Sequence, residues 1–142
     1  MSTLASFFSF FQRTRVEEKL LHLVVPIGSS GAVGTLAGNS SFFTVTKISG
    51  TAKYEIVFAQ PFPAYNGNGV AFNPLIAMHA TVVSAGAPTN EVTVAVYGVS
   101  KAVTGIYTID FGTYVNSTAA NLSSGDEVHF TFNMAATSAS YA

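Results

Sequence analysis

FTVTKISGTAKYEIVF, residues 43–58, is the stretch that decides the fold of this chain. Before the Ser49-Gly50-Thr51 segment, apolar side chains alternate with threonines, and after it they alternate with Lys53 and Glu55. Because side chains two positions apart on a strand share one face, the pattern predicts two strands with a common apolar face. The glycine between them is typical of a tight connection. A β-hairpin is therefore expected at the centre of the structure.

The same alternation, punctuated by Gly, Asn, Ser and Pro, continues on both sides of this hairpin. It predicts about seven strands, at 20–27, 42–48, 53–58, 75–84, 91–99, 105–111 and 127–134. Short turns and no long helix connect them, so we expect antiparallel pairing, and seven such strands close most simply as a two-layer sandwich. The expected fold is thus an all-β antiparallel β-sandwich. Its inward-facing residues would include Ile76, Met78, Ala80, Val82, Val92, Val94, Val96, Val128, Phe130, Phe132 and Met134.

The chain carries very little charge. Of its 142 residues, six are Lys or Arg and seven are Asp or Glu, which makes 9% charged residues and a net charge of -1. A typical soluble domain has about 25% charged residues. Without a basic field, we expect no binding to nucleic acid, and no apolar run approaches the roughly 18 residues that cross a membrane. The composition predicts a neutral β domain that covers much of its surface with partners.

The first residues differ in composition from the rest of the chain. Five of the charged residues lie within positions 13–19, which marks off an N-terminal arm. The local pattern of this arm fits an extended segment or either of two helices. Apolar residues at positions 4, 7, 8 and 11 would share one face of a helix. A capping box at 14–17 would instead start a helix at Arg15. The expected division of the chain is an arm at 1–19, a sandwich domain at 20–135 and a flexible tail at 136–142.

Four phenylalanines stand within five positions of this arm. The segment lacks the early positive charge and the small-residue cleavage site of a signal peptide, so we expect it in the mature protein. Phenylalanines with so little polar cover are expected to dock on another surface. The predicted partner-binding residues are Phe7, Phe8, Phe10, Phe11, Arg13 and Arg15.

Residues that could carry chemistry are few. Cysteine is absent, which excludes disulfides and thiolate metal sites, and the histidines are His22, His79 and His129. Glu127 and His129 are two positions apart and would share a strand face, as a general base or a weak metal site requires. A third ligand is missing at any diagnostic spacing, so we expect these two on a solvated strand face. The sequence predicts no catalytic residue, no cofactor and no metal, and hence no enzyme.

The hairpin at 43–58, followed by Pro61-Phe62-Pro63, resembles a pattern common in small virion proteins of tailed bacteriophages. Residues 119–130 look like the last loop and strand of the same family. The resemblance implies a head decoration, or cement, protein: a β-sandwich on the capsid surface that binds the lattice of the major capsid protein. Such proteins are commonly trimers, so the resemblance also implies a homotrimer.

The sequence is also compatible with two other functions. The chain could be a phage tail, baseplate or fibre-tip module whose loops at 65–69 and 112–125 bind a host receptor or a glycan. It could also be a non-viral, lectin-like or secreted β-sandwich. Binding to capsid shells distinguishes the first reading from both.

Overall fold

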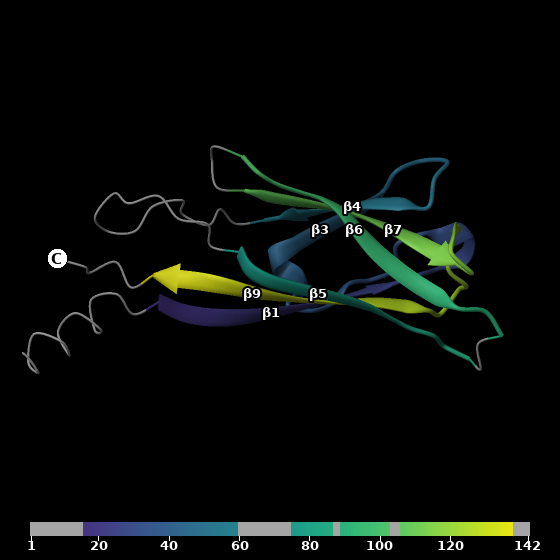
Figure 1. Ribbon diagram of the computed structural model, residues 1–142, viewed down its shortest axis with the longest axis horizontal. Coiled ribbons are helices and arrows are strands. Elements are labelled where there is room, and N and C mark those ends of the chain that lie inside the picture. The colour runs from purple at the N-terminus through teal and green to yellow at the C-terminus, as the bar shows by residue number, and fades with distance from the viewer. Residues whose placement is uncertain (1–15, 60–74, 87–88, 103–105, 138–142) are drawn as a thin grey trace, which may run out of the picture.

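Two antiparallel sheets packed face to face make up the structure (Figure 1). The computed structural model describes residues 16–59, 75–86, 89–102 and 106–137. Sheet I has the strand order β2-β1-β9-β5, and sheet II has the order β3-β4-β7-β6, with β8 pairing to β7. The strands are β1 (Val16–Pro26), β2 (Ala37–Gly38), β3 (Phe43–Lys47), β4 (Lys53–Phe58), β5 (Leu75–Val83), β6 (Val92–Lys101), β7 (Tyr107–Val115), β8 (Thr118–Ala119) and β9 (Glu127–Thr137). The predicted all-β sandwich is confirmed.

The predicted hairpin is β3–β4, in which Val45 opposes Ile56 and Gly50 has a φ of 74°. A positive φ costs glycine little, so this residue suits the turn. The inward side chains of the hairpin are buried, as the alternation predicted. The short strands β2 and β8 were not predicted, because two-residue strands leave no periodic pattern in the sequence.

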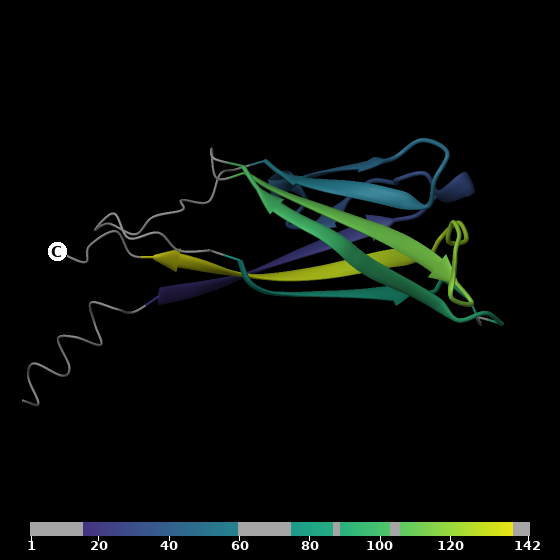
Figure 2. The ribbon, with the colours of Figure 1, turned by 45° about the horizontal axis from the view of Figure 1, so that its top comes forward.

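Both ends of the sandwich domain extend further than the sequence pattern predicted. Strand β1 begins at Val16, which pairs with Thr137 at the end of β9. The helix expected to start at Arg15 is therefore wrong from Val16 onward, and β9 continues past the expected strand end at 134. Pairing over eleven residues with a strand from the far end of the chain outweighs a weak local capping signal. Figure 2 shows that the start of β1 and the end of β9 lie at the same end of the molecule.

The core is aromatic and joins the two sheets. Phe132 of β9 lies with its ring centroid 5.2 Å from both Phe43 and Phe58 of sheet II. Phe130, on the same face of β9, meets Phe111 of β7 at 4.9 Å. Offset and edge-to-face ring pairs at these distances add to the burial of their apolar area. The inward positions of β9 thus contact β3, β4 and β7 of the opposite sheet.

Residues 27–42 cover one long side of the sandwich as the chain passes from β1 to β3. Within them β2 pairs with β1, and the 3-10 turn at Ser40–Phe42 contacts both β1 and β3. A second 3-10 turn, Ser29–Gly31, is tied to the hairpin: the Tyr54 hydroxyl donates to the Gly31 carbonyl at 2.6 Å, and Lys47 Nζ donates to the Ser30 carbonyl at 2.6 Å. We call the long side that residues 27–42 cover the closed side.

None of the described segments forms a helix with the length and apolarity needed to span a membrane.

Candidate functional site: an open side and a histidine face

The long side opposite residues 27–42 is formed by β5 and β6, the edge strands of the two sheets. These strands pack against each other, and their inward residues contact the core. No described side chain of either strand is buried, whereas the inward positions of their neighbours β9 and β7 are. The partly exposed inward residues are Leu75, Met78, Ala80, Val82, Val92, Val94 and Val96. We call this the open side.

The C-terminal half of β6 carries two exposed large side chains, Tyr97 and Val99. A bulge between Val96 and Gly98 shifts the register, after which Val99 opposes the buried Ile109. Val99 therefore faces inward, yet 48% of it is exposed. Tyr97, next to the inward-facing Val96, points to the outer face and is also 48% exposed, with Lys53 Nζ 5.1 Å from its ring centroid. Bulges commonly re-aim side chains at sheet edges, and here the bulge turns Val99 toward the inner face of an edge strand.

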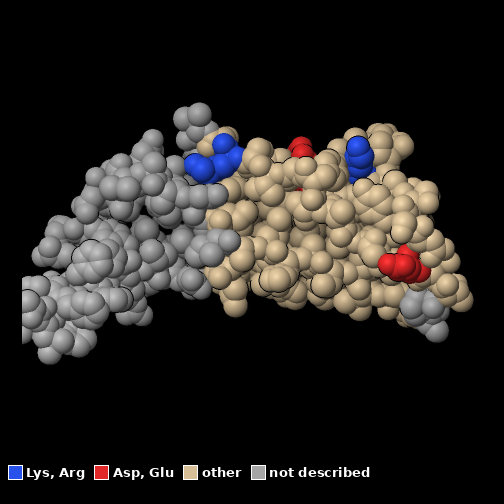
Figure 3. Space-filling model, viewed as in Figure 1, with Lys and Arg blue, Asp and Glu red and all other residues tan. Residues whose placement is uncertain are grey.

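Few charges interrupt this side of the molecule. In Figure 3, where β5 and β6 lie toward the viewer, Lys, Arg, Asp and Glu side chains are isolated within a surface of uncharged residues. Charged groups are costly to bury without partners, so a surface with few of them is easily covered by another protein.

The outer face of sheet I carries all three histidines of the chain. His22 of β1 and His79 of β5 both lie opposite Thr131 of β9, one on each side. His129 lies two positions earlier on β9 and on the same face. Residues far apart in the sequence, at 22, 79 and 129, are thus collected on three adjacent strands.

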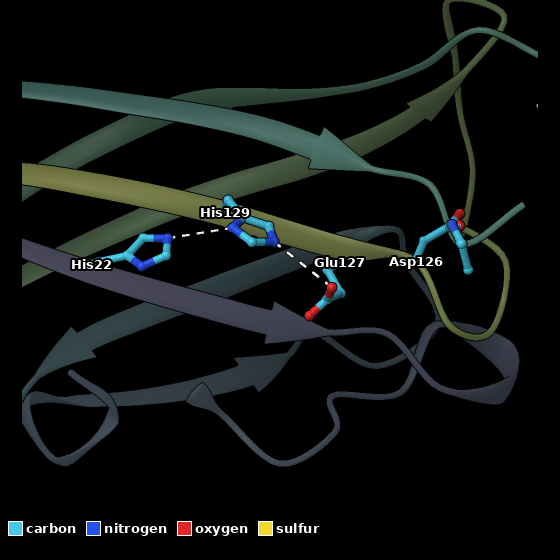
Figure 4. Close-up of polar contacts among 5 residues, drawn as sticks. His22, Asp126, Glu127 and His129 are labelled. Atoms are coloured by element: carbon cyan, nitrogen blue, oxygen red, sulfur yellow. Dashed lines mark hydrogen bonds and ion pairs between the residues drawn. The ribbon is translucent and has the colours of Figure 1, made fainter. Parts of the chain in front are cut away.

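Two of these imidazoles are in contact, as Figure 4 shows. His22 Nε2 lies 3.3 Å from His129 Nδ1, and the ring centroids are 5.4 Å apart. On the other side of the ring, His129 Nε2 lies 3.8 Å from Glu127 Oε1. That Nε2 atom is buried and has no hydrogen-bond partner, although the His129 side chain as a whole is 29% exposed. The exposed part of the His129 side chain therefore does not include Nε2.

The backbone at His22 is held by the neighbouring strand. Its N–H donates to Asn39 Oδ1 at 2.7 Å, and its carbonyl accepts from the Asn39 N–H at 2.6 Å. Gly38 has a φ of 75°, and a Cβ there would collide with the His22 carbonyl. The close approach of β2 therefore requires glycine at this position and fixes the strand from which His22 projects.

Asp126 is a buried carboxylate with a structural role. It is 3% exposed and accepts hydrogen bonds from the backbone N–H groups of Ala85 at 3.0 Å and Ser123 at 3.1 Å, and from Ser84 Oγ at 3.3 Å. These contacts join the loop after β5 to the loop before β9, beside a hollow of about 210 Å³. Its oxygens are occupied by loop contacts, so Asp126 acts as a clamp between the two loops.

The structure describes some of the site residues predicted from the sequence and not others. Phe7, Phe8, Phe10, Phe11, Arg13 and Arg15 lie outside the described residues, so their predicted role stays a prediction. Glu127 and His129 do share the outer face of β9. His22 was not predicted to join them, because the pairing of β1 with β9 spans 107 positions and leaves no local signal.

Within the described ranges, no group of three or more His, Cys, Asp or Glu side chains is placed to hold a metal ion. Comparisons of the chain with protein-family models, with curated proteins and with solved structures found no match.

Proposed function

We propose that this protein is a structural, non-enzymatic subunit of a virion: a head decoration protein that binds the major capsid protein lattice of a tailed bacteriophage, as a homotrimer on the capsid surface. The observation that supports the proposal is the open side, where two edge strands present apolar side chains that the described part of the chain covers only in part. Burying apolar surface contributes about 25 cal/mol per Å². A neighbouring subunit on this side would complete a core that the single chain leaves unfinished.

The low charge of the chain favours the same proposal. A surface with 9% charged residues meets a small desolvation penalty when it is covered over a large area. A decoration protein needs such an area, because it contacts several lattice subunits and often its own copies. The resemblance of the β3–β4 hairpin and of residues 119–130 to phage virion proteins makes the capsid lattice the preferred partner.

The phenylalanines at 7, 8, 10 and 11 are the proposed anchors on the capsid. They precede β1, and fifteen residues in extended form reach at most about 50 Å. Each phenylalanine, once fully buried, would contribute on the order of 1.5–3 kcal/mol before ordering costs. In this proposal the open side and the arm bind different parts of the lattice.

The test is addition of the purified chain to capsid shells assembled without it. We expect saturable binding and a higher disruption temperature of the shells. Val99→Lys adds a charge to the open side and should weaken binding at least about tenfold, because an unpaired charge is costly to bury. Thr93→Lys adds the same charge to the exposed outer face of the same strand and should bind like the unmodified chain.

A truncation and an adsorption assay complete the test. Removal of residues 1–12 should lower both the affinity and the disruption temperature. Absence of saturable binding to the shells contradicts the proposal. Loss of host adsorption on deleting the loop tip at 116–117, with the shells unaffected, would instead support the tail or fibre-tip function.

A further inference from the structure

We infer that His22 and His129 form a binding site for a divalent transition-metal ion of the Cu²⁺, Ni²⁺ and Zn²⁺ class. The two imidazole nitrogens, His22 Nε2 and His129 Nδ1, lie 3.3 Å apart in a hydrogen bond, so the proton between them must leave when an ion binds. At metal–nitrogen distances of about 2.0–2.1 Å, two ligands of one tetrahedral ion are about 3.3–3.4 Å apart. The pair thus already has the ligand-to-ligand spacing that such an ion requires. This inference does not depend on the proposed function.

The surroundings of the His129 ring suit metal binding. Its Nε2 is buried and faces the Glu127 carboxylate at 3.8 Å, so the proton of a neutral ring is favoured on Nε2. The lone pair then lies on Nδ1, toward His22. A carboxylate on the far side of a ligating imidazole can orient the ring, as carboxylates do around many metal sites. Glu127 is therefore assigned a positioning role.

The site is accessible and has a rigid base. His22 is exposed and its ring can turn, while its backbone is held by Asn39 through two hydrogen bonds. His129 projects from the central strand β9, which is paired on both sides. Two protein nitrogens leave the remaining coordination positions to water, so the site is expected to take the ion from solution and to exchange it.

The expected order of affinity follows from the ligand type. Imidazole nitrogens suit Cu²⁺, Ni²⁺ and Zn²⁺, and divalent ions bind such sites in the Irving–Williams order, with Cu²⁺ the tightest. Ca²⁺ and Mg²⁺ prefer oxygen ligands and should not compete. This selectivity distinguishes a site made by the two histidines from general attraction of cations to Glu127.

The experiment is titration of the full chain, purified without a histidine tag, with CuCl₂ and separately with ZnCl₂ by calorimetry. We expect saturable binding and a copper EPR spectrum with hyperfine coupling to two imidazole nitrogens. His22→Gln and His129→Gln should each abolish this signal. His79→Gln is the matched control, since it removes the third histidine of the same face and should leave the signal unchanged.

Two further measurements separate a role in binding from a role in folding. Zn²⁺ should raise the unfolding temperature of the unmodified chain, because a ligand that binds the native state stabilises it. The His22→Gln variant should show no such rise. Its circular dichroism spectrum should match that of the unmodified chain, which shows that the variant is folded. Glu127→Gln should weaken binding about tenfold without changing the number of coordinated nitrogens. The inference is overturned if no ion binds saturably, if His79→Gln weakens binding as much as His22→Gln, or if both His22 and His129 variants retain the two-nitrogen spectrum.

Discussion

The two long sides of the sandwich are built from similar sequence but are covered very differently. On the closed side, residues 27–42 cross from one sheet to the other, and the inward Phe43 and Val45 of the edge strand β3 are buried. On the open side, β5 and β6 also alternate, with one register shift in each, yet Val82 and Val94 stay partly exposed. Alternation therefore identifies the side chains that face inward, whereas the connecting segments decide how completely they are covered.

The largest effect is expected where both sheets meet. Phe132→Ala removes a ring that packs on Phe43 and Phe58 of the opposite sheet, and it should lower the free energy of unfolding by about 3–5 kcal/mol. Met78→Ala changes its register partner on β5, which is only partly buried, and should cost less than about 2 kcal/mol. Urea unfolding followed by circular dichroism measures both. Equal losses of unfolding free energy in the two variants would contradict the expectation that the buried Phe132 contributes more than the partly exposed Met78.

A sharper test uses one residue type at two neighbouring positions. Val82 of β5 and Val128 of β9 oppose each other on the same face, but only Val128 is fully buried. Val128→Ala should cost about 2–3 kcal/mol, from two lost methyl groups and the cavity that they leave. Val82→Ala should cost about 1 kcal/mol or less. Urea unfolding of the two variants, followed by circular dichroism, measures both losses.

The same pair allows a test of what covers the open side. If another subunit completes this side, Val82→Ala should become more costly in the assembled state than in the isolated chain. The disruption temperature of decorated shells would then fall by more than the unfolding temperature of the free protein. If Val82→Ala leaves the disruption temperature of the decorated shells unchanged, the lattice partner does not bind the open side.

Local patterns predicted most of the fold, because strands and turns depend on neighbouring residues. The β3–β4 hairpin and the inward face of β9 followed directly from alternation. Pairing between distant strands did not, since no local signal connects Val16 with Thr137. The same limit explains the site: Glu127 and His129 could be placed together as neighbours on one strand, whereas His22 reaches them only through the pairing of β1 with β9.

The smallest effect concerns the contact that holds the closed side to the hairpin. The buried Tyr54 hydroxyl donates to the Gly31 carbonyl, so Tyr54→Phe should cost about 1 kcal/mol at neutral pH. Tyr97→Phe, on the exposed edge strand β6, is the matched control and should change stability by less than about 0.5 kcal/mol. A larger loss at Tyr97 would mean that the open side is more tightly packed than its exposure indicates.

The pH dependence of the same variant separates the hydroxyl from the ring. Burial raises the pKa of Tyr54, and burial also raises the pKa of Tyr107, partly offset by the N–H that Leu75 donates to its hydroxyl. A group whose pKa is higher in the folded chain binds its proton more tightly there, so its contribution is fully present below the unfolded pKa of about 10 and is lost as the pH rises further. The free energy of unfolding should therefore fall above about pH 10, and it should fall less steeply in Tyr54→Phe. Urea unfolding between about pH 8 and 11 measures both slopes. Identical slopes would mean that Tyr54 ionises as readily in the folded chain as in the unfolded one, and that the closed side does not shield it from water.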